Sequence, residues 1–320
     1  MATVLALTVA ASTASVGARV KRAEPAITIS PQKLSAALSC NGRLTHAARD
    51  PILLVPGTTL DPGINFSWNY ERAFNHQHWP WCGITLPAEA MGDIQIAAEY
   101  VVYAIRTMHA KASRRVDLLG YSQGGMVPRW SLKYWPSVRR MVNDYVGIDP
   151  SNHGTLDAAP VCLTTCAPAI WQQAKGSKFL TALNHGPETW RGIDYTVIYS
   201  HTDEVVVPNV SPTGSSTLHT GNGRIRNVAV QSVCPLDLSE HLAMGTYDSV
   251  AYALAMDAFT HRGPARPSRV AHSVCTQLFM PGVVPSAFGS DYATYVTHIA
   301  TVLATAHKTS AEPRLAPYTH

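Results

Sequence analysis

The chain has few charged residues for its length of 320, and no long apolar run outside its first residues. Charged residues make up 14% of the sequence, and the net charge at pH 7 is +4. The basic residues form isolated pairs such as Arg114-Arg115, not a block that would follow a phosphate backbone, so we expect no nucleic acid partner. No internal stretch reaches the roughly 18 apolar residues of a membrane-spanning helix. With 46% hydrophobic residues, the chain can bury a large core, and we expect one soluble domain.

The cysteines lack the spacing of metal ligands. They include no CxxC motif and no cluster with histidine, so disulfides are favoured over zinc, and we expect neither a metal nor an organic cofactor. Six cysteines allow fifteen pairings, and their even number favours an exported protein. The cysteines are Cys40, Cys82, Cys162, Cys166, Cys234 and Cys275.

The N-terminus is typical of a targeting segment. The apolar, small-residue stretch TVLALTVAASTASVGA precedes the basic pair Lys21-Arg22. We expect a signal and pro segment over residues 1–22, a single catalytic domain over 23–320, and secretion. No lysine or arginine precedes the apolar stretch, which leaves a flexible leader as the alternative. Two N-x-S sequons, at Asn65 and Asn209, are compatible with a glycosylated surface.

Strand and helix patterns alternate along the chain, without repeats. Short apolar runs predict buried strands, and apolar residues at helical spacing predict the helices between them. Strands separated by helices indicate an α/β fold, a mostly parallel central sheet with helices on both faces, in which sites form at the carboxyl ends of the strands. The predicted strands are 52–55, 116–119, 141–149 and 195–200, and the predicted helices are 93–110 and 123–135.

The sequence GYSQG at residues 120–124 matches the pattern G-x-S-x-G. A buried strand precedes it and a helix follows, which is the context of a nucleophile elbow. In such an elbow the glycines allow strand and helix to approach closely while the serine backbone is strained. Ser122 is therefore our candidate nucleophile, held beside the N-terminus of the helix.

A serine of ordinary pKa needs a base, and the base needs an acid that orients it. In this architecture the acid and then the histidine follow the serine in the chain. Asp203 follows a predicted strand and is the leading acid, with Asp149 second and Glu204 third. His241, at the start of an apolar helical run, is the favoured base, and His219 is its competitor.

Acyl transfer also requires donors for the oxyanion. In this architecture one is the backbone N–H after the nucleophile, here Gln123, and the other lies in the loop after an early strand. Thr58, in the segment VPGTT, is placed to offer both its backbone and its hydroxyl. The alternative for this segment is a plain Pro-Gly turn.

Several longer motifs resemble the Candida antarctica lipase B family in the same order along the chain. They are DPILLVPGT at 50–58, SQGG at 122–125, PAIWQQ at 168–173, TDE at 202–204 and EPRLAPY at 312–318. The resemblance runs from about residue 35 to the C-terminus and implies an α/β-hydrolase fold. It implies Ser122 as nucleophile, Asp203 as acid and His241 as base, and it favours Asp203 over Asp149. It also implies an oxyanion hole at Thr58 and Gln123.

The same resemblance implies a substrate pocket and two disulfides. Asp149 and Gln173 would line the acyl side, Val205 would border it, and Tyr121 would stand where the family has a tryptophan below the alcohol group. The implied disulfides are Cys40–Cys82 and Cys234–Cys275, which leave Cys162–Cys166 by elimination.

This chain departs from the family at several positions. Gly120 replaces a threonine, Ala311 stands at the first cysteine of a missing C-terminal disulfide, and Pro128 is expected to distort its helix. The apolar segment 157–171 resembles the mobile region above the active site. A ring closed by Cys162 and Cys166 would stiffen it, so we expect a short or nearly fixed lid.

These observations predict a secreted serine hydrolase of carboxylic esters, a triacylglycerol lipase or a broad esterase. Its partner would be a lipid or small ester, taken from solution or from a lipid–water interface, and a monomer is expected. Within the enzymes, the alternative is a polyester hydrolase of the cutinase type. The alternative from another class is a noncatalytic binding protein, but such proteins usually lose a triad residue.

Overall fold

The computed structural model describes residues 23–42, 44–45 and 47–319. The signal and pro segment expected over residues 1–22 lies outside this range. Among the described residues, no helix combines the length and the apolar character needed to cross a bilayer.

A seven-stranded sheet forms the centre of the described chain, in the order β1-β3-β2-β4-β5-β6-β7. Only β1 is antiparallel to its neighbour, so the predicted mostly parallel sheet is confirmed. The strands are β1 (Leu38–Cys40), β2 (Ile52–Val55), β3 (Trp81–Ile84), β4 (Val116–Tyr121), β5 (Val142–Ile148), β6 (Asp194–Tyr199) and β7 (Arg224–Ala229).

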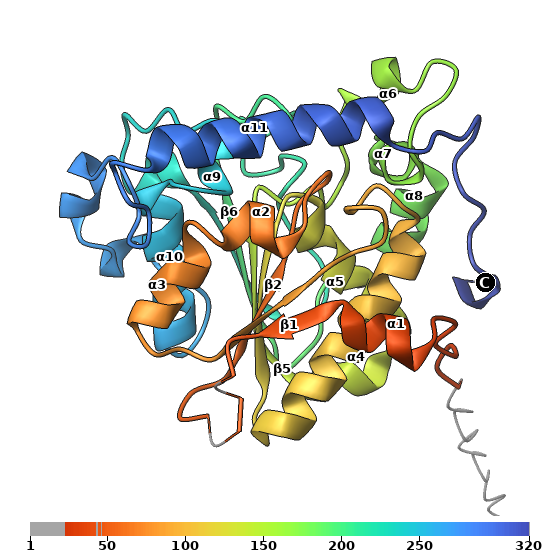
Figure 1. Cartoon of the computed structure of the whole chain (residues 1–320), viewed down its shortest axis with the longest axis horizontal. Helices are drawn as coiled ribbons and strands as arrows, with labels where there is room; N and C mark the ends of the chain where they lie inside the picture. Colours follow the sequence, from red (N-terminus) through yellow and green to blue (C-terminus); the bar gives the residue numbers. More distant parts are fainter. Residues whose placement is uncertain (1–22, 43, 46, 320) are drawn as a thin grey trace, which may run out of the picture.

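Helices cover both faces of the sheet (Figure 1). The α-helices are α1 (Pro31–Ala36), α2 (Pro62–Phe66), α3 (Tyr70–His76), α4 (Ile94–Ala112), α5 (Gln123–Tyr134), α6 (Ala158–Val161), α7 (Pro168–Gln173), α8 (Lys178–Asn184), α9 (His241–Met244), α10 (Ser249–Thr260) and α11 (Phe288–Thr305). The 3-10 helices are η1 (Pro136–Arg140), η2 (Val230–Ser232), η3 (Pro267–Arg269), η4 (His272–Thr276) and η5 (Pro317–Thr319).

The two cores follow from alternation along the strands. In β2, Leu53 and Val55 pack into the core that contains α4 and α5, whereas Ile52 and Leu54 pack into the core that contains α3 and α10. Every β2 residue is therefore buried, and the strand is apolar throughout, as expected for a parallel strand covered on both faces. This burial explains why such a short run was recognisable in the sequence.

The two predicted helices are confirmed as α4 and α5. Asp93 caps α4 by accepting a hydrogen bond from the N–H of Gln95. Helix α5 starts directly after Ser122 and continues through Pro128 to Tyr134 as one element. The proline thus does not interrupt the helix that follows the elbow.

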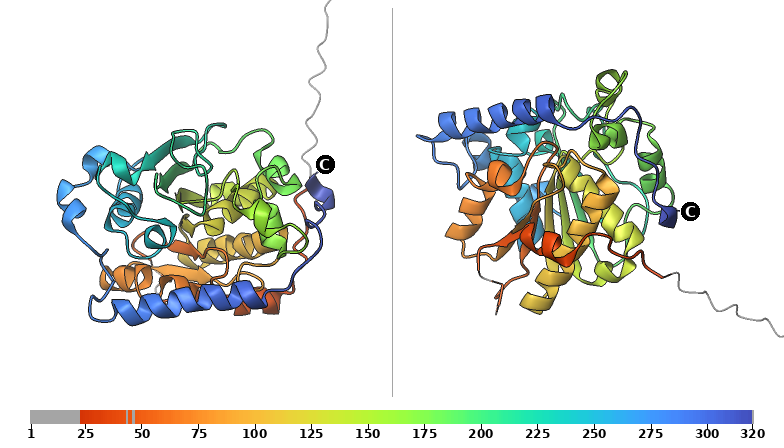
Figure 2. Two further views of the ribbon diagram at one scale, coloured as in Figure 1. Left: turned by 90° about the horizontal axis from the view of Figure 1, so that it is seen from above. Right: turned by 45° about the vertical axis from the view of Figure 1, so that its right-hand side comes forward.

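Helix α11 crosses one edge of the molecule (Figures 1 and 2). In the view of Figure 1 it lies above α9, α2 and α7. The sequence analysis did not predict this helix. Its residues Tyr295, Ile299 and Leu303 recur every four positions on one face, which is buried at Tyr295, half-buried at Ile299 and exposed at Leu303.

The three expected disulfides are confirmed. Cys40–Cys82 joins β1 to β3, Cys162–Cys166 closes a small ring after α6, and Cys234–Cys275 joins the segment before α9 to η4. Disulfides of this number are typical of proteins that mature in an oxidising compartment.

Candidate active site

The turn between β4 and α5 has the geometry of a nucleophile elbow. Ser122 has φ 53° and ψ −125°, a conformation that side chains rarely adopt. A Cβ on Gly120 would overlap the backbone of Gly124, and a Cβ on Gly124 would overlap the carbonyl of Val55. Both glycines are therefore required by close backbone contacts, and the strain is concentrated at the serine.

Three side chains that lie far apart in the sequence form one hydrogen-bonded chain. His241 Nε2 lies 3.0 Å from Ser122 Oγ, and His241 Nδ1 lies 3.0 Å from Asp203 Oδ2. All three residues are buried. The nucleophile-base and base-acid contacts are thus both of hydrogen-bond length.

Asp203 is held as a carboxylate. Its Oδ1 accepts the backbone N–H groups of Val205 and Val206 at 2.9 and 2.8 Å, and its Oδ2 accepts Asn209 Nδ2 at 3.3 Å. Burial alone would raise the pKa of Asp203, but His241 and these donors lower it below its usual range. The negative charge can therefore orient the imidazole.

The side chains of Glu204 and His219 do not take part in this hydrogen-bonded chain. Glu204 is exposed, and its Oε2 accepts the backbone N–H of His241 at 3.1 Å. His219 is exposed and lies 2.8 Å from the hydroxyl of Thr217. Glu204 thus supports the backbone of the histidine, and His219 does not contact the triad.

Asp149 differs from what the family resemblance implied. It does not line the cavity but is fully buried at φ 39°, with ligand atoms of Asp203 and His241 within 4.8 Å of its own. Its Oδ1 accepts the N–H of Ser200 at 2.9 Å, and its buried Oδ2 makes no hydrogen bond. Burial, followed by the charge of Asp203, raises the pKa of Asp149 well above its usual value, which favours the neutral form of this carboxyl.

The predicted oxyanion residues meet at one side of Ser122. Gln123 is the first residue of α5, so its N–H has no partner within that helix. Its side-chain Oε1 accepts Thr58 Oγ1 at 3.1 Å and Gln173 Nε2 at 2.9 Å, and its Nε2 donates to the carbonyl of Ala90 at 2.9 Å. This network fixes the loop after β2 against the start of α5.

A cavity of about 310 Å³ opens over the serine. Tyr121, Gln173 and Val205 line it, in agreement with the resemblance. The sequence analysis missed several other lining residues, because they come from separate parts of the chain: the loops after β2 and β5, and the helices α7, α9 and α11. Those residues include Leu60, Ser151, Thr155, Ile170, Leu242, Tyr295, Ile299 and Leu303.

Comparison with known proteins agrees with this geometry. The family model described as lipase (class 2) matches residues 100–242. Lipase B of Pseudozyma antarctica is 33% identical over 301 residues, which cover 92% of this chain and 86% of that protein. The chain belongs to the lipase B family. Membership identifies it as a lipase, an enzyme class that hydrolyses carboxylic esters.

Solved structures support the same assignment. Aspergillus fumigatus lipase B superposes with a TM-score of 0.83 at 30% identity, covering 93% of this chain and 74% of that one. A Bacillus licheniformis lipase in its propeptide form matches with a TM-score of 0.52 at 16% identity, covering 72% of this chain and 54% of that one. The second likeness concerns the fold alone, which is that of the α/β-hydrolases.

In this lipase B family member, Tyr121 does more than line the cavity. Its hydroxyl donates to the backbone carbonyl of His241 at 3.0 Å, and the two rings lie 5.0 Å apart. A Cβ at Gly57 or Gly245 would overlap the tyrosine ring, so both glycines make room for it. Tyr121 therefore connects the elbow to the segment that carries the histidine.

The asparagines of both N-x-S sequons are buried, which argues against a glycan at either position. Asn65 accepts the N–H of Gly57 at 3.1 Å and donates to the carbonyl of Gly245 at 3.3 Å. Asn209 donates to Asp203 and, at 2.8 Å, to Ser216 Oγ. Each amide connects segments of the site, so neither is free to carry a glycan.

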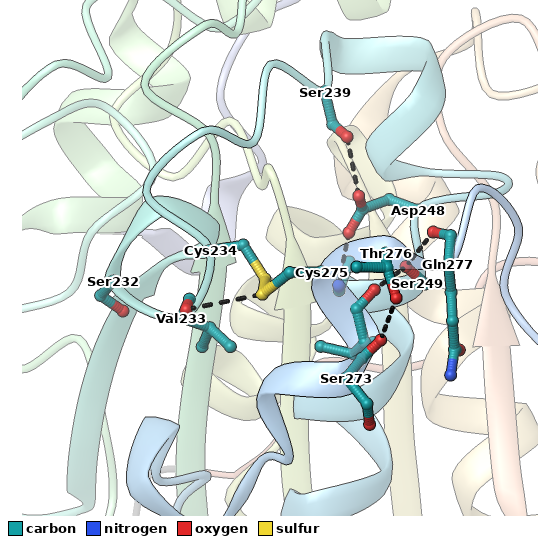
Figure 3. Close-up of a disulfide and its surroundings, with 12 residues drawn as sticks. Ser232, Val233, Cys234, Ser239, Asp248, Ser249, Ser273, Cys275, Thr276 and Gln277 are labelled. Atoms are coloured by element: carbon teal, nitrogen blue, oxygen red, sulfur yellow. Dashed lines mark hydrogen bonds between the residues drawn. A yellow bond between two sulfur atoms is a disulfide. The ribbon is translucent and has the colours of Figure 1, made fainter.

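The loop before His241 is fixed by a disulfide and a hydrogen bond (Figure 3). The disulfide Cys234–Cys275 ties its beginning to η4, and Ser239 Oγ donates to Asp248 Oδ2 at 2.7 Å near its end. Asp248 in turn caps α10. The loop that leads to the histidine is thus held near both of its ends.

The segment 157–171 lies beside the cavity. Asp157, Ala158, Val161 and Ile170 line the cavity, while Leu163 is 83% exposed. Cys166 exchanges backbone hydrogen bonds with Thr309 at 3.1 and 2.9 Å, beyond the end of α11. The segment is therefore tied to the C-terminal region as well as closed on itself by the disulfide.

Proposed function

We propose that this chain is a secreted serine lipase or carboxylesterase that cleaves esters, triacylglycerols among them, through an acyl-enzyme on Ser122. The supporting observation is the continuous hydrogen-bonded chain from Ser122 through His241 to Asp203. Family membership and the apolar cavity above the serine agree with an ester substrate. We further propose that residues 1–22 direct secretion and that residues 23–320 act as a monomer.

Each residue has a defined part in the proposed reaction. His241 Nε2 accepts the proton of Ser122 as Oγ bonds to the ester carbonyl carbon, and the resulting oxyanion is bound by N–H donors at Thr58 and Gln123. The same imidazole then protonates the leaving alkoxide as the C–O bond breaks. A water molecule, deprotonated by His241, attacks the acyl-enzyme, and release of the acid restores Ser122. Asp203 stabilises the imidazolium throughout.

Active-site labelling tests this proposal. A fluorophosphonate should label the parent chain on Ser122, and Ser122→Ala should lose both the label and ester hydrolysis. Thr217→Val, a loss of hydroxyl beside His219, is the control and should label normally. Labelling that persists in folded Ser122→Ala would refute the assignment of the nucleophile. A parent chain that is neither labelled nor active would support the noncatalytic alternative.

The walls of the cavity bear on the cutinase-type alternative. Residues of helix α11 and of segment 157–171 both line the cavity. An extended polymer chain would need these walls to move apart, so the geometry favours small esters and lipids. Release of soluble fragments from a polyester film at the rate seen with a dissolved ester would reverse this preference.

A further inference from the structure

Asn209 is a buried side chain beside Asp203 that has no part in the reaction proposed above. It lies in the loop between β6 and β7 and is 1% exposed. It does not line the cavity over the serine. Any effect of Asn209 on ester hydrolysis must therefore pass through the groups that it bonds.

The orientation of this amide is set by Ser216. Asn209 Oδ1 accepts the backbone N–H of Ser216 at 3.0 Å, so the amide nitrogen must face the other way. That nitrogen donates to Ser216 Oγ at 2.8 Å and to Asp203 Oδ2 at 3.3 Å. Both N–H groups of the amide are thus used, and one of them is directed at the carboxylate.

Buried hydrogen bonds join this amide to the helix that begins after the nucleophile. The carbonyl of Ser216 accepts a hydrogen bond from Asn152 Nδ2 at 2.6 Å, and Asn152 Oδ1 accepts one from Arg129 Nη1 at 3.2 Å. Arg129 lies in α5, about two turns after Ser122, and is fully buried with Glu188 as its counter-charge. Because a shift of any of these groups would leave a buried partner unsatisfied, the amide is held in a fixed position relative to α5.

The hydrogen bonds of Asp203 show what the amide contributes. Oδ1 is held by two backbone N–H groups, whereas Oδ2 faces His241 Nδ1 at 3.0 Å. Besides the imidazole, Oδ2 accepts the hydrogen bond from Asn209. Loss of the amide would remove a donor from a buried charged oxygen, and such a loss costs more than that of an exposed hydrogen bond.

We propose that Asn209 is a positioning residue for the proposed catalytic acid, and that its amide keeps Asp203 Oδ2 directed at His241. The inference rests on the proposed function, because Asn209 acts only through Asp203. A carboxylate held at both oxygens cannot rotate away from the imidazole, and it keeps His241 in the tautomer that accepts the serine proton. A displacement of the acid by about 1 Å would slow the chemical step without changing how the ester binds.

Steady-state hydrolysis of a soluble ester by Asn209→Leu tests this role, because leucine removes the amide and keeps its approximate volume. We expect kcat to fall about ten- to a hundredfold, with KM changed less than about twofold because Asn209 does not line the cavity. In an Asp203→Ala background the same change should cost less than about threefold, since the acid through which Asn209 acts is then absent. The rate of fluorophosphonate labelling replaces turnover where turnover is too slow.

Two control variants separate this role from other effects of the loop. Asn227 in β7 fastens the far end of the same loop, accepting the N–H of Leu218 at 3.0 Å and donating to its carbonyl at 2.9 Å. Asn227→Leu should therefore keep the kcat of the parent. Ser211→Ala removes the sequon but leaves the amide, so it should also behave like the parent and exclude loss of a glycan as the cause.

Three outcomes would overturn the inference. These are equal kcat in the parent and folded Asn209→Leu, an equal loss in Asn227→Leu, or an undiminished loss in the Asp203→Ala background. If circular dichroism shows that Asn209→Leu does not fold, Asn209→Ala decides the question. A failure of the proposed function is distinguishable, because the parent itself would then be neither labelled nor active.

Discussion

Both edges of the parallel sheet bury acidic side chains. Only at one edge of the described sheet does a histidine form a hydrogen bond with such an acid. At the carboxyl edge, Asp203 follows β6 and Asp149 follows β5, beside His241. At the amino edge, Asp117 and Asp144 lie near the starts of β4 and β5, and no histidine bonds to either among the described residues. The same residue type thus meets two different environments on one sheet.

At the amino edge, the effect of burial on the carboxyl groups exceeds that of the donors and arginine charges around them. Burial, and then the charge of Asp144, raises the pKa of Asp117 well above its usual value. Burial, with Asp194 as the next cause, raises the pKa of Asp144 to about 8. Asn143 donates to both carboxyl groups, at 3.2 and 2.7 Å, but it carries no charge. These acids are therefore held largely neutral.

At the carboxyl edge, the pKa values of the two acids are shifted in opposite directions. Asp203 accepts two backbone N–H bonds and contacts the imidazole, and its pKa is lowered. Asp149 accepts one N–H bond, and its pKa is raised. A buried carboxyl group becomes a candidate catalytic acid through the donors around it. Where the surrounding donors are too few, burial raises the pKa of the carboxyl group, as it does for Asp117 and Asp144.

The largest expected effect comes from exchanging the acids for amides at the carboxyl edge. Asp203→Asn should lower kcat about 10³- to 10⁴-fold, because an amide that donates to His241 holds the wrong tautomer. Asp149→Asn should cost less than about tenfold, since a neutral side chain replaces a neutral one and can still accept the N–H of Ser200. Steady-state hydrolysis of a soluble ester measures both.

Asp149→Asn also serves as the control for Asp203→Asn, because the two amides are introduced at neighbouring buried positions. Equal losses of activity in both folded variants would mean that Asp149 is ionised, and the contrast between the two acids would fail.

The next effect concerns two disulfides with almost equal sequence separations. Cys234–Cys275 and Cys40–Cys82 span 41 and 42 residues, so removing either should cost about 4 kcal/mol of stability by the chain-entropy estimate. Only the first braces the loop before His241. The double serine variant at Cys234 and Cys275 should therefore also lose activity, about ten- to a hundredfold.

Denaturant unfolding and ester hydrolysis, measured where both variants are folded, compare the two losses directly. Equal activity in the two variants would show that the histidine loop does not need its brace.

The amino edge predicts a pH-dependent stability. The folded pKa of Asp144 lies above its unfolded value, so its stabilising contribution is complete below about pH 4 and is lost as the pH rises toward about 8. Asp144→Asn should then be more stable than the parent at pH 8, by about 1 to 3 kcal/mol, and similar to it at pH 4. Urea unfolding at both pH values measures this difference.

Asp257→Asn is the matched control, because Asp257 is also buried but forms an ion pair with Arg269 and is not among the groups that shift the pKa of Asp144. That variant should gain nothing at pH 8. A stability change in Asp144→Asn that is the same at both pH values would exclude titration as its cause.

Four buried strands, β2, β4, β5 and β6, could be predicted because their sequences are locally apolar, but the buried strand β3 and the edge strand β7 were not predicted. In β7, exposed or half-exposed residues such as Arg224 and Arg226 precede two buried ones, so the strand has no apolar run. Helix α11 begins after Ala287, which makes no side-chain cap, so its start carries no signal. Both elements depend on tertiary packing.

The candidate site divides in the same way. The elbow was readable because Gly120, Ser122 and Gly124 meet their steric requirements within one turn. The structural parts of Asn65 and Asn209 could not be read from their sequons, because the groups they bond lie up to 180 residues away.

The smallest expected effect concerns segment 157–171, which lies beside the cavity at the carboxyl edge. Removing the Cys162–Cys166 ring should loosen segment 157–171 and increase the dependence of the rate on a lipid interface. The increase should stay below about threefold, because so short a ring restricts few conformations. The backbone bonds between Cys166 and Thr309, and the bond from Trp171 Nε1 to Thr309 at 3.1 Å, remain to hold the segment.

The measurement is the rate on a sparingly soluble short-chain ester on either side of its solubility limit, with the Cys40 and Cys82 double serine variant as control. In the parent, the rate should rise smoothly through the limit, because the doubly tethered cover cannot swing far from the cavity. The Cys162 and Cys166 double serine variant should show a modest step, and the control should follow the parent. A steep step in the parent that the loosened variant reproduces unchanged would mean that a mobile cover exists and that this disulfide does not restrain it.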